Sequence, residues 1–93
     1  MNFEWSEDKA AANLAKHEVS FEEAQTAFED CSALIIDDPD HSDDEERFVL
    51  LGLSAKARML VVCHCYREND ARIRLISARK ATKNESATYE KRK

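Results

Sequence analysis

Three apolar segments in the second half of the chain follow one another with very short connections between them. Residues 47–53, 59–66 and 72–79 are rich in valine, isoleucine, leucine and aromatic side chains, a composition typical of β-strands. The connections at residues 54–57 and 67–71 are short enough for hairpin turns. The three segments therefore predict consecutive antiparallel strands, which constrains the fold more than any other feature.

Capping residues predict three helices around these strands. Ser6 precedes two acidic residues and an apolar stripe that ends near residue 17. Ser20 and Thr82 each stand three residues before a glutamate, the spacing of a capping box. They predict a second helix that ends near residue 30 and a last helix in the carboxy-terminal segment. Residues 33–36 form a fourth strand candidate, and an exposed acidic loop is expected at residues 37–44.

The order of these elements predicts one α+β domain over residues 1–93. Its sheet is expected to be an antiparallel four-stranded meander, with two amino-terminal helices and one carboxy-terminal helix packed on it. No apolar run approaches the ~18 residues needed to cross a bilayer, and the first residues lack the features of a signal peptide. Three cysteines without a framework spacing fit a reducing compartment. We therefore expect a cytoplasmic protein.

The formal net charge of −5 is unevenly distributed along the chain. Residues 1–46 contain 15 acidic and two basic side chains, whereas residues 47–93 contain 12 basic and four acidic ones. Because phosphate binding is local, the overall negative sign does not exclude an RNA ligand on the basic half. The acidic half is expected to offer a surface for a basic partner.

The simplest registers of the two hairpins bring chemistry-bearing side chains from three strands into one row. In these registers His64 lies opposite Arg74 on one side and opposite Arg47 on the other. Directly opposed residues share a face of the sheet. We therefore expect Arg47, His64 and Arg74 in one row, with Tyr66 and Arg72 beside it. A register slip of one residue would remove this row.

Such a cluster suits the cleavage of RNA by attack of the 2′-hydroxyl group on the adjacent phosphate. A histidine can transfer protons near neutral pH, and arginine forks match the geometry of a phosphate. Tyrosine can stack on a base of single-stranded RNA. The structural alternative is a surface ion pair of Arg74 with Glu46 or Glu68, together with a histidine that has no role in chemistry.

Cys63, His64 and Cys65 have the density of a metal site but not its geometry. Strand alternation sends His64 to the face opposite both thiols, and the chain has no second pair of ligands at zinc spacing. We therefore expect neither a metal nor another cofactor.

Two blocks of the sequence suggest a family. The first contains Phe3-Glu4-Trp5, then Lys16-His17, then Val19-Ser20-Phe21; the second is Ile76-Ser77-Ala78-Arg79-Lys80-Ala81-Thr82, followed by Glu85 and Tyr89. Together these blocks resemble the BrnT-type toxins over nearly the whole chain. One departure is Glu18, where the family usually has glycine after the Lys-His pair. Glu18 must therefore either adopt a strained positive φ or alter the turn.

The resemblance implies a RelE-like fold and a ribonuclease toxin of a type II toxin–antitoxin system that inhibits translation. It also implies neutralisation by a BrnA-type antitoxin with a DNA-binding ribbon-helix-helix region. Operator DNA would then be contacted only through the antitoxin. Arg47 and Arg79 are the catalytic candidates that the resemblance implies, and Lys16, His17 and Tyr89 also match family positions.

We therefore predict a metal-independent endoribonuclease toxin that acts on an RNA substrate. The alternative is a non-catalytic interaction module or co-repressor. The predicted catalytic residues are Arg47, His64, Arg74 and Arg79, and the predicted RNA-binding residues are Lys16, His17, Tyr66, Arg72, Lys80 and Tyr89.

Overall fold

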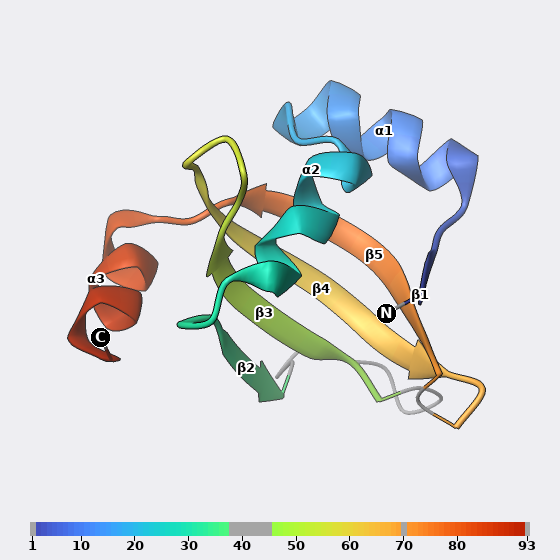
Figure 1. The fold of residues 1–93 in the computed structure, drawn as a ribbon. Helices are drawn as coiled ribbons and strands as arrows, with labels where there is room; N and C mark the ends of the chain where they lie inside the picture. The colour runs from blue at the N-terminus through green and yellow to red at the C-terminus, as the bar shows by residue number, and fades with distance from the viewer. Residues whose placement is uncertain (1, 38–45, 70, 93) are drawn as a thin grey trace.

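A five-stranded sheet in the order β1-β5-β4-β3-β2 forms the centre of the molecule (Figure 1). The computed structural model describes residues 2–37, 46–69 and 71–92, so all but the first residue of the acidic loop expected at 37–44 lies outside the described residues. The elements are β1 (Asn2–Glu4), α1 (Glu7–His17), α2 (Phe21–Thr26), the 3₁₀ helix η1 (Ala27–Glu29), β2 (Leu34–Asp37), β3 (Phe48–Leu53), β4 (Met59–Arg67), β5 (Arg72–Lys80) and α3 (Lys83–Arg92). Among these described elements, no helix is long and apolar enough to cross a membrane.

The α+β class is confirmed, but the predicted antiparallel four-stranded meander is wrong. The sheet is mixed, because a fifth strand, β1, pairs in parallel with β5 and places Phe3 opposite Ile73. β1 has three residues, too few for a periodic pattern, and tertiary contacts hold it in place. The ring of Phe3 packs edge-on against Phe28 with centroids 5.1 Å apart, and Glu4 pairs with Arg74 at 2.9 Å.

The helices also differ from the expected arrangement. α2 ends at Thr26, and the chain continues as η1 rather than as one helix to residue 30. α1, α2 and η1 cover one face of the sheet, which we call the helix face, whereas Tyr89 of α3 packs with Leu51 and Val61 on the opposite face. Figure 1 shows α3 well separated from α1 and α2. The carboxy-terminal helix therefore has its own small core.

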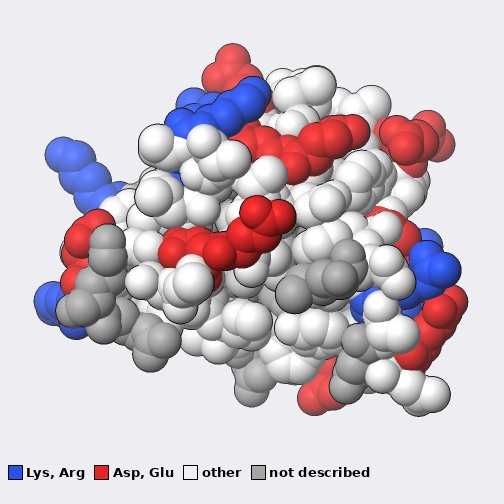
Figure 2. Space-filling model, viewed as in Figure 1, with Lys and Arg blue, Asp and Glu red and all other residues white. Residues whose placement is uncertain are grey.

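The helix face carries much of the acidic charge. Figure 2 shows acidic side chains across this side of the molecule, with Lys and Arg mostly nearer its margins. The exposed carboxylates of α1, α2, η1 and the residue after α1 are Glu7, Asp8, Glu18, Glu22 and Glu29. The uneven charge of the sequence is thus also an uneven charge in space.

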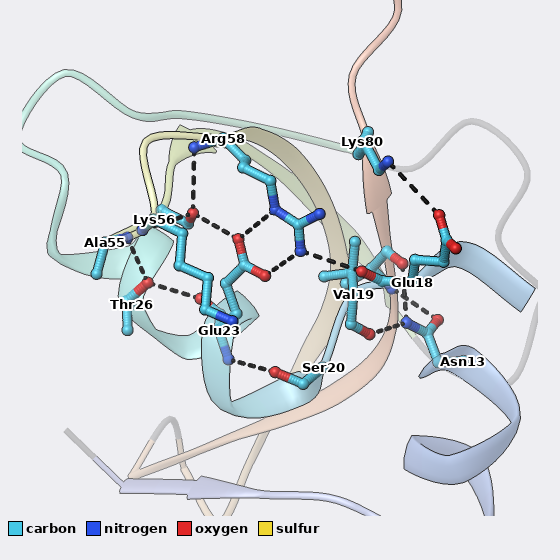
Figure 3. Close-up of polar contacts among 12 residues, drawn as sticks. Asn13, Glu18, Val19, Ser20, Glu23, Thr26, Ala55, Lys56, Arg58 and Lys80 are labelled. Carbon is cyan, nitrogen blue, oxygen red and sulfur yellow. Dashed lines mark hydrogen bonds and ion pairs between the residues drawn. The ribbon is translucent and has the colours of Figure 1, made fainter. Parts of the chain in front are cut away.

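Glu23 has the capping-box spacing but a different role. Its backbone N–H donates to Ser20 Oγ at 3.0 Å, whereas its nearly inaccessible carboxylate pairs with Arg58 and accepts a hydrogen bond from Ser54 Oγ at 2.7 Å (Figure 3). The hydrogen bond from Arg58 lowers the pKa of Glu23, although burial acts in the opposite direction. Arg58 also donates to the backbone carbonyl of Glu18 at 3.0 Å. This network ties α2 and the end of α1 to the turn between β3 and β4.

The end of α1 keeps its left-handed turn without glycine. Glu18 has φ 61° and ψ 32°, so it adopts the strained conformation, and its N–H donates to the carbonyl of Leu14 at 2.9 Å. The buried Asn13 side chain donates to the carbonyls of Val19 and Ala78, both at 2.9 Å, and accepts from the Ala78 N–H at 3.0 Å. These hydrogen bonds of Asn13 attach α1 to the edge of β5.

Both hairpins differ by one residue from the predicted registers. Leu53 lies opposite Met59, and a hydrogen bond from Ser54 N to Arg58 O at 2.8 Å closes a three-residue loop. In the second hairpin Arg67 lies opposite Arg72. The loops contain left-handed residues other than glycine: Ala57, Glu68 and Asn69. Because turn geometry sets strand register and no glycine marks these turns, the sequence pattern alone gave the wrong register.

A bulge on β5 changes its alternation. His64 lies opposite Leu75, but the preceding residue Cys63 lies opposite Ser77, which leaves Ile76 as an extra residue on β5. Because of this extra residue, every later side chain of β5 lies on the face opposite to the one that regular alternation would give it.

Gly52 should not tolerate a side chain. A Cβ atom there would lie 2.9 Å from the Ala27 carbonyl oxygen of η1 and 3.1 Å from Ala33 Cβ. We expect Gly52→Ala to lower the free energy of unfolding by about 1–3 kcal/mol, measured by urea denaturation. Ala57→Gly is the matched control, because it relieves a positive φ of 62°. Equal stability of Gly52→Ala and the wild type would contradict the close packing of η1 on β3.

Candidate active site

Five arginines lie on the face of the sheet opposite α1 and α2. Strand pairing places Arg67 opposite Arg72, Arg74 opposite Cys65, and Arg79 opposite Val61. Alternation puts residues 61, 63, 65 and 67 of β4 on one face. Arg47 lines a hollow with Val49, Val61 and Arg79 and so belongs to the same face. We call this the arginine face; its arginines are Arg47, Arg67, Arg72, Arg74 and Arg79.

The predicted row of Arg47, His64 and Arg74 is wrong in its central member. Phe48 lies opposite His64, which lies opposite Leu75, whereas Cys65 lies opposite Arg74. Arg47 precedes β3, whose described pairing begins at Phe48. The structure therefore keeps Arg47 and Arg74 on one face and places Cys65, instead of His64, beside Arg74.

The bulge is what puts Arg79 on this face. Arg74 and Arg79 are five residues apart, so regular alternation would place them on opposite faces. The extra residue Ile76 restores them to the same face. Bulges commonly re-aim side chains near functional sites, and here one adds a second arginine of β5 to the arginine face.

A cavity of about 320 Å³ opens on the arginine face between Arg47 and Arg79. Neither aspartate nor glutamate is among the described residues that line it, which are Arg47, Val49, Val61, Cys63, Ile76, Ser77 and Arg79. This arrangement combines two guanidinium groups, a hydroxyl and an apolar floor. Its chemistry suits an anionic ligand with an apolar portion, because guanidinium groups bind phosphates in a forked geometry.

Glu85 holds the guanidinium group of Arg79 in place. Nη1 and Nη2 of Arg79 donate to the two carboxylate oxygens of Glu85, each at 2.8 Å. Glu85 also accepts from the backbone N–H of Thr82 at 2.8 Å, and its own N–H donates to Thr82 Oγ1, so the predicted capping box of α3 is confirmed. These interactions, led by Arg79, lower the pKa of Glu85 to about 2. The start of α3 therefore orients Arg79 at the cavity.

Arg72 and Arg74, at the other end of the face, are paired with carboxylates. Arg74 Nε lies 2.9 Å from Glu4 Oε2, and Arg72 Nε lies 3.0 Å from Glu68 Oε2. Arg72 also lies 3.9 Å from Glu4. Among the predicted catalytic arginines, Arg47 and Arg79 thus line the cavity, whereas Arg74 is engaged by β1.

His64 lies on the helix face and is completely buried. Its ring contacts Phe28 and Tyr66 edge-on, with centroids 4.9 and 5.3 Å apart. Nδ1 donates to the Val62 carbonyl at 3.1 Å, which leaves Nε2 to accept from the Tyr66 hydroxyl at 3.4 Å. Burial lowers the pKa of His64. The structure therefore separates both His64 and Tyr66 from the arginine face.

The remaining predicted RNA-binding residues lie in three places. Lys16 and His17 line a hollow between α1 and β5. Lys80 lies opposite Leu60 and approaches the exposed Glu18 at 3.8 Å. Tyr89 is buried, and its hydroxyl donates to Asp30 at 2.6 Å. Tyr89 thus attaches α3 to the sheet rather than lining the cavity.

Cys63 and Ser77 in the cavity, and Glu85 as the partner of Arg79, were not predicted from the sequence. Ser77 and Arg79 share a face by alternation, but only the bulge at Ile76 places both on the face that holds Arg74. Glu85 was recognised as a capping residue, and its second role could not be read from its spacing. Arg67, the fifth arginine of the face, follows Tyr66, and alternation alone separates the two.

A family model described as the ribonuclease toxin BrnT of type II toxin–antitoxin systems matches residues 5–85. The chain belongs to the BrnT family. It is thus a BrnT-family ribonuclease toxin of a type II toxin–antitoxin system, which implies an RNA substrate and an antitoxin partner.

The BrnT fold is also found among solved structures. The structure is similar to the 1.1 Å crystal structure of the Brucella abortus ribonuclease toxin BrnT, with a TM-score of 0.68 and 24% sequence identity. The match covers 89% of this chain and 99% of the Brucella chain. At this identity the likeness shows the fold alone. No curated protein matches the sequence.

The buried His64 should make this BrnT-family protein less stable in mild acid. Its pKa is lowered in the folded state, so below the ordinary value of 6.5 the unfolded chain binds more protons than the folded one. We expect the free energy of unfolding to fall as the pH drops below about 6.5, by at most about 1.4 kcal/mol per pH unit. Urea denaturation between pH 5 and 7.5 measures this dependence.

The contribution of His64 is isolated by comparing His64→Gln with the wild type. The variant should have a flatter pH profile, because it lacks the buried imidazole. Glu85 stays ionised throughout this range, since its pKa is about 2. An unchanged slope in His64→Gln would contradict the neutral, buried state of His64.

Proposed function

We propose that this chain cleaves RNA at the cavity between Arg47 and Arg79, by attack of a 2′-hydroxyl group on the adjacent phosphate. The attack forms a 2′,3′-cyclic phosphate and breaks the bond between phosphorus and the 5′ oxygen. Solvent water takes the 2′ proton and protonates the leaving 5′ oxygen. The observation that carries the proposal is the cavity itself: two guanidinium groups and a hydroxyl line it, without a lining carboxylate among the described residues. RNA is the substrate class that the family implies. The cleaved phosphate would lie between the two arginines.

The arginines would stabilise the negative charge that the phosphate gathers in the transition state. One donor aimed at such a charge contributes about 3–4 kcal/mol in other enzymes. Arg79 is pre-organised for this task, because Glu85 fixes its guanidinium group and the side chain keeps 42% of its surface exposed. Glu85 occupies two of the five N–H directions, and others of the fork remain for a phosphate.

We propose that this cleavage requires no metal ion. The cavity provides fixed positive charge from arginine, and its described lining lacks the carboxylate oxygens that hold Mg²⁺ in proteins. His64 has no access to this cavity in the structure, since it is buried on the opposite face. The proposal therefore assigns electrostatic stabilisation, and not proton transfer by His64, to the described residues.

Removal of either cavity arginine should impair RNA cleavage. We expect Arg47→Ala and Arg79→Ala each to lower kcat by about 10²–10³-fold. Arg79→Lys should recover only part of the loss, because lysine keeps the charge but not the fork. The assay is cleavage of a labelled RNA by purified protein, with and without a chelator. Lys56→Ala is the control, since Lys56 is exposed and lies outside the cavity lining.

The outcomes separate the alternatives. Full activity of both alanine variants would exclude the cavity as the cleavage site. Loss of activity with chelator would exclude the metal-free mechanism. A wild-type protein that cleaves no RNA would instead favour the alternative of a non-catalytic interaction module.

We further propose that the antitoxin is BrnA-like, that a basic segment of it binds the acidic helix face, and that operator DNA is contacted through it. Support comes from the five exposed carboxylates on and beside the helices of that face (Figure 2). Inhibition of translation and a RelE-like character remain predictions from the resemblance.

If the helix face attracts a basic antitoxin segment, the association rate should fall as salt rises. Stopped-flow or surface binding with the antitoxin at increasing NaCl measures this rate. The double variant Glu22→Gln/Glu29→Gln should associate more slowly at low salt. A rate that is independent of salt would contradict this surface.

A further inference from the structure

A second hollow of about 270 Å³ lies between α1 and β5, beside the arginine cavity. The residues that line it are Lys9, Ala12, Asn13, Lys16, His17, Ile76 and Ser77. Two of these are lysines and one is a histidine, and the described lining includes no carboxylate. We call this hollow the α1 groove.

The α1 groove and the arginine cavity adjoin each other. Ile76 and Ser77 line both hollows, so the two meet across β5 at the position of the bulge. The junction is built from the extra residue of the strand and the serine that follows it. A chain-like ligand could therefore pass from one hollow into the other without leaving the surface.

The fold explains why a groove exists at this place. β1 pairs with β5 only at residues 72–74, so it does not cover the outer edge of the later part of β5. α1 lies along that part instead, and Asn13 fixes it there through the backbone of Ala78. On α1, Lys16 lies seven residues after Lys9, and His17 lies eight residues after it. Both spacings return to the same side of a helix. The two lysines are about 10 Å apart along the helix axis.

The charge of the two hollows contrasts with that of the chain. The protein has 19 acidic side chains and a net charge of −5, yet the described linings of both hollows contain Arg47, Arg79, Lys9, Lys16 and His17 and no acidic residue. Such a local strip of positive charge attracts a polyanion despite the overall sign.

We propose that the α1 groove binds backbone phosphates of the nucleotides next to the cleaved bond, so that a single RNA strand crosses β5 at Ile76 and Ser77. This inference rests on the proposed function, because it takes the arginine cavity as the site of cleavage. It adds a second binding site and assigns Lys9 and Lys16 to phosphate contacts. His17 lies in the same groove.

The test measures binding of a ten-nucleotide 2′-O-methyl RNA, which lacks the attacking hydroxyl group and stays intact. Fluorescence anisotropy at several NaCl concentrations gives the affinity and its salt slope. We expect Lys9→Gln/Lys16→Gln to bind on the order of tenfold more weakly than the wild type. The slope of log K against log salt should decrease in magnitude by about 1.4, since each lost phosphate contact on a single strand contributes about 0.7.

Lys56→Gln/Lys91→Gln is the matched control, because it removes the same charge from two exposed lysines outside both hollows. Both double variants should have the thermal stability of the wild type, since all four lysines are exposed. Arg79→Ala tests the cavity separately and should weaken binding in its own right.

Three results would overturn the proposal. If the two double variants bind equally, the groove makes no specific contact, whereas a loss in Arg79→Ala would keep the proposed cleavage site. If Lys9→Gln/Lys16→Gln binds RNA with wild-type affinity and slope, the RNA leaves the cavity by another path. If the wild type does not bind the RNA, both the groove and the proposed function are wrong.

Discussion

The pairing of β4 with β3 and β5 determines the side of the sheet on which each functional side chain lies. Side chains alternate with a period of two, so a shift of one residue moves a whole strand from one face to the other. The observed registers turn His64 and Tyr66 into the apolar core under η1 and leave Cys63 and Cys65 among the arginines. The bulge at Ile76 then adds Arg79 to the side that holds Arg74.

The arginine face concentrates positive charge, and carboxylates from other elements balance part of it. Glu4 and Glu68 pair with Arg74 and Arg72 at one end of the face, and Glu85 pairs with Arg79 at the other. Because these carboxylates come from β1, from the turn before β5 and from α3, they also attach those elements to the sheet. The described cavity lining is left without an acidic side chain. The same ion pairs that attach peripheral elements therefore leave a site suited to a phosphate.

Two regions of the surface, which differ in the sign of their charge, suit different partners. Carboxylates are exposed on and beside the helices of the helix face, whereas the arginine cavity and the α1 groove expose guanidinium and ammonium groups. A toxin of this family has an RNA substrate and an antitoxin partner. The net charge of −5 does not reveal this difference, because it is the sum of an acidic first half and a basic second half of the chain.

The sequence alone determined the features that depend on neighbouring residues. Ser6, Ser20 and Thr82 cap the helices as predicted, the four strands after α2 were recognised, and the two sequence blocks indicated the BrnT family. Only the tertiary structure decided the parallel pairing of β1, the strand registers, the bulge and the burial of His64 and Tyr89. Capping and strand propensity act within a few residues and leave a local pattern. Register and burial depend on left-handed turns without glycine, such as that at Ala57, and on packing between segments far apart in the chain.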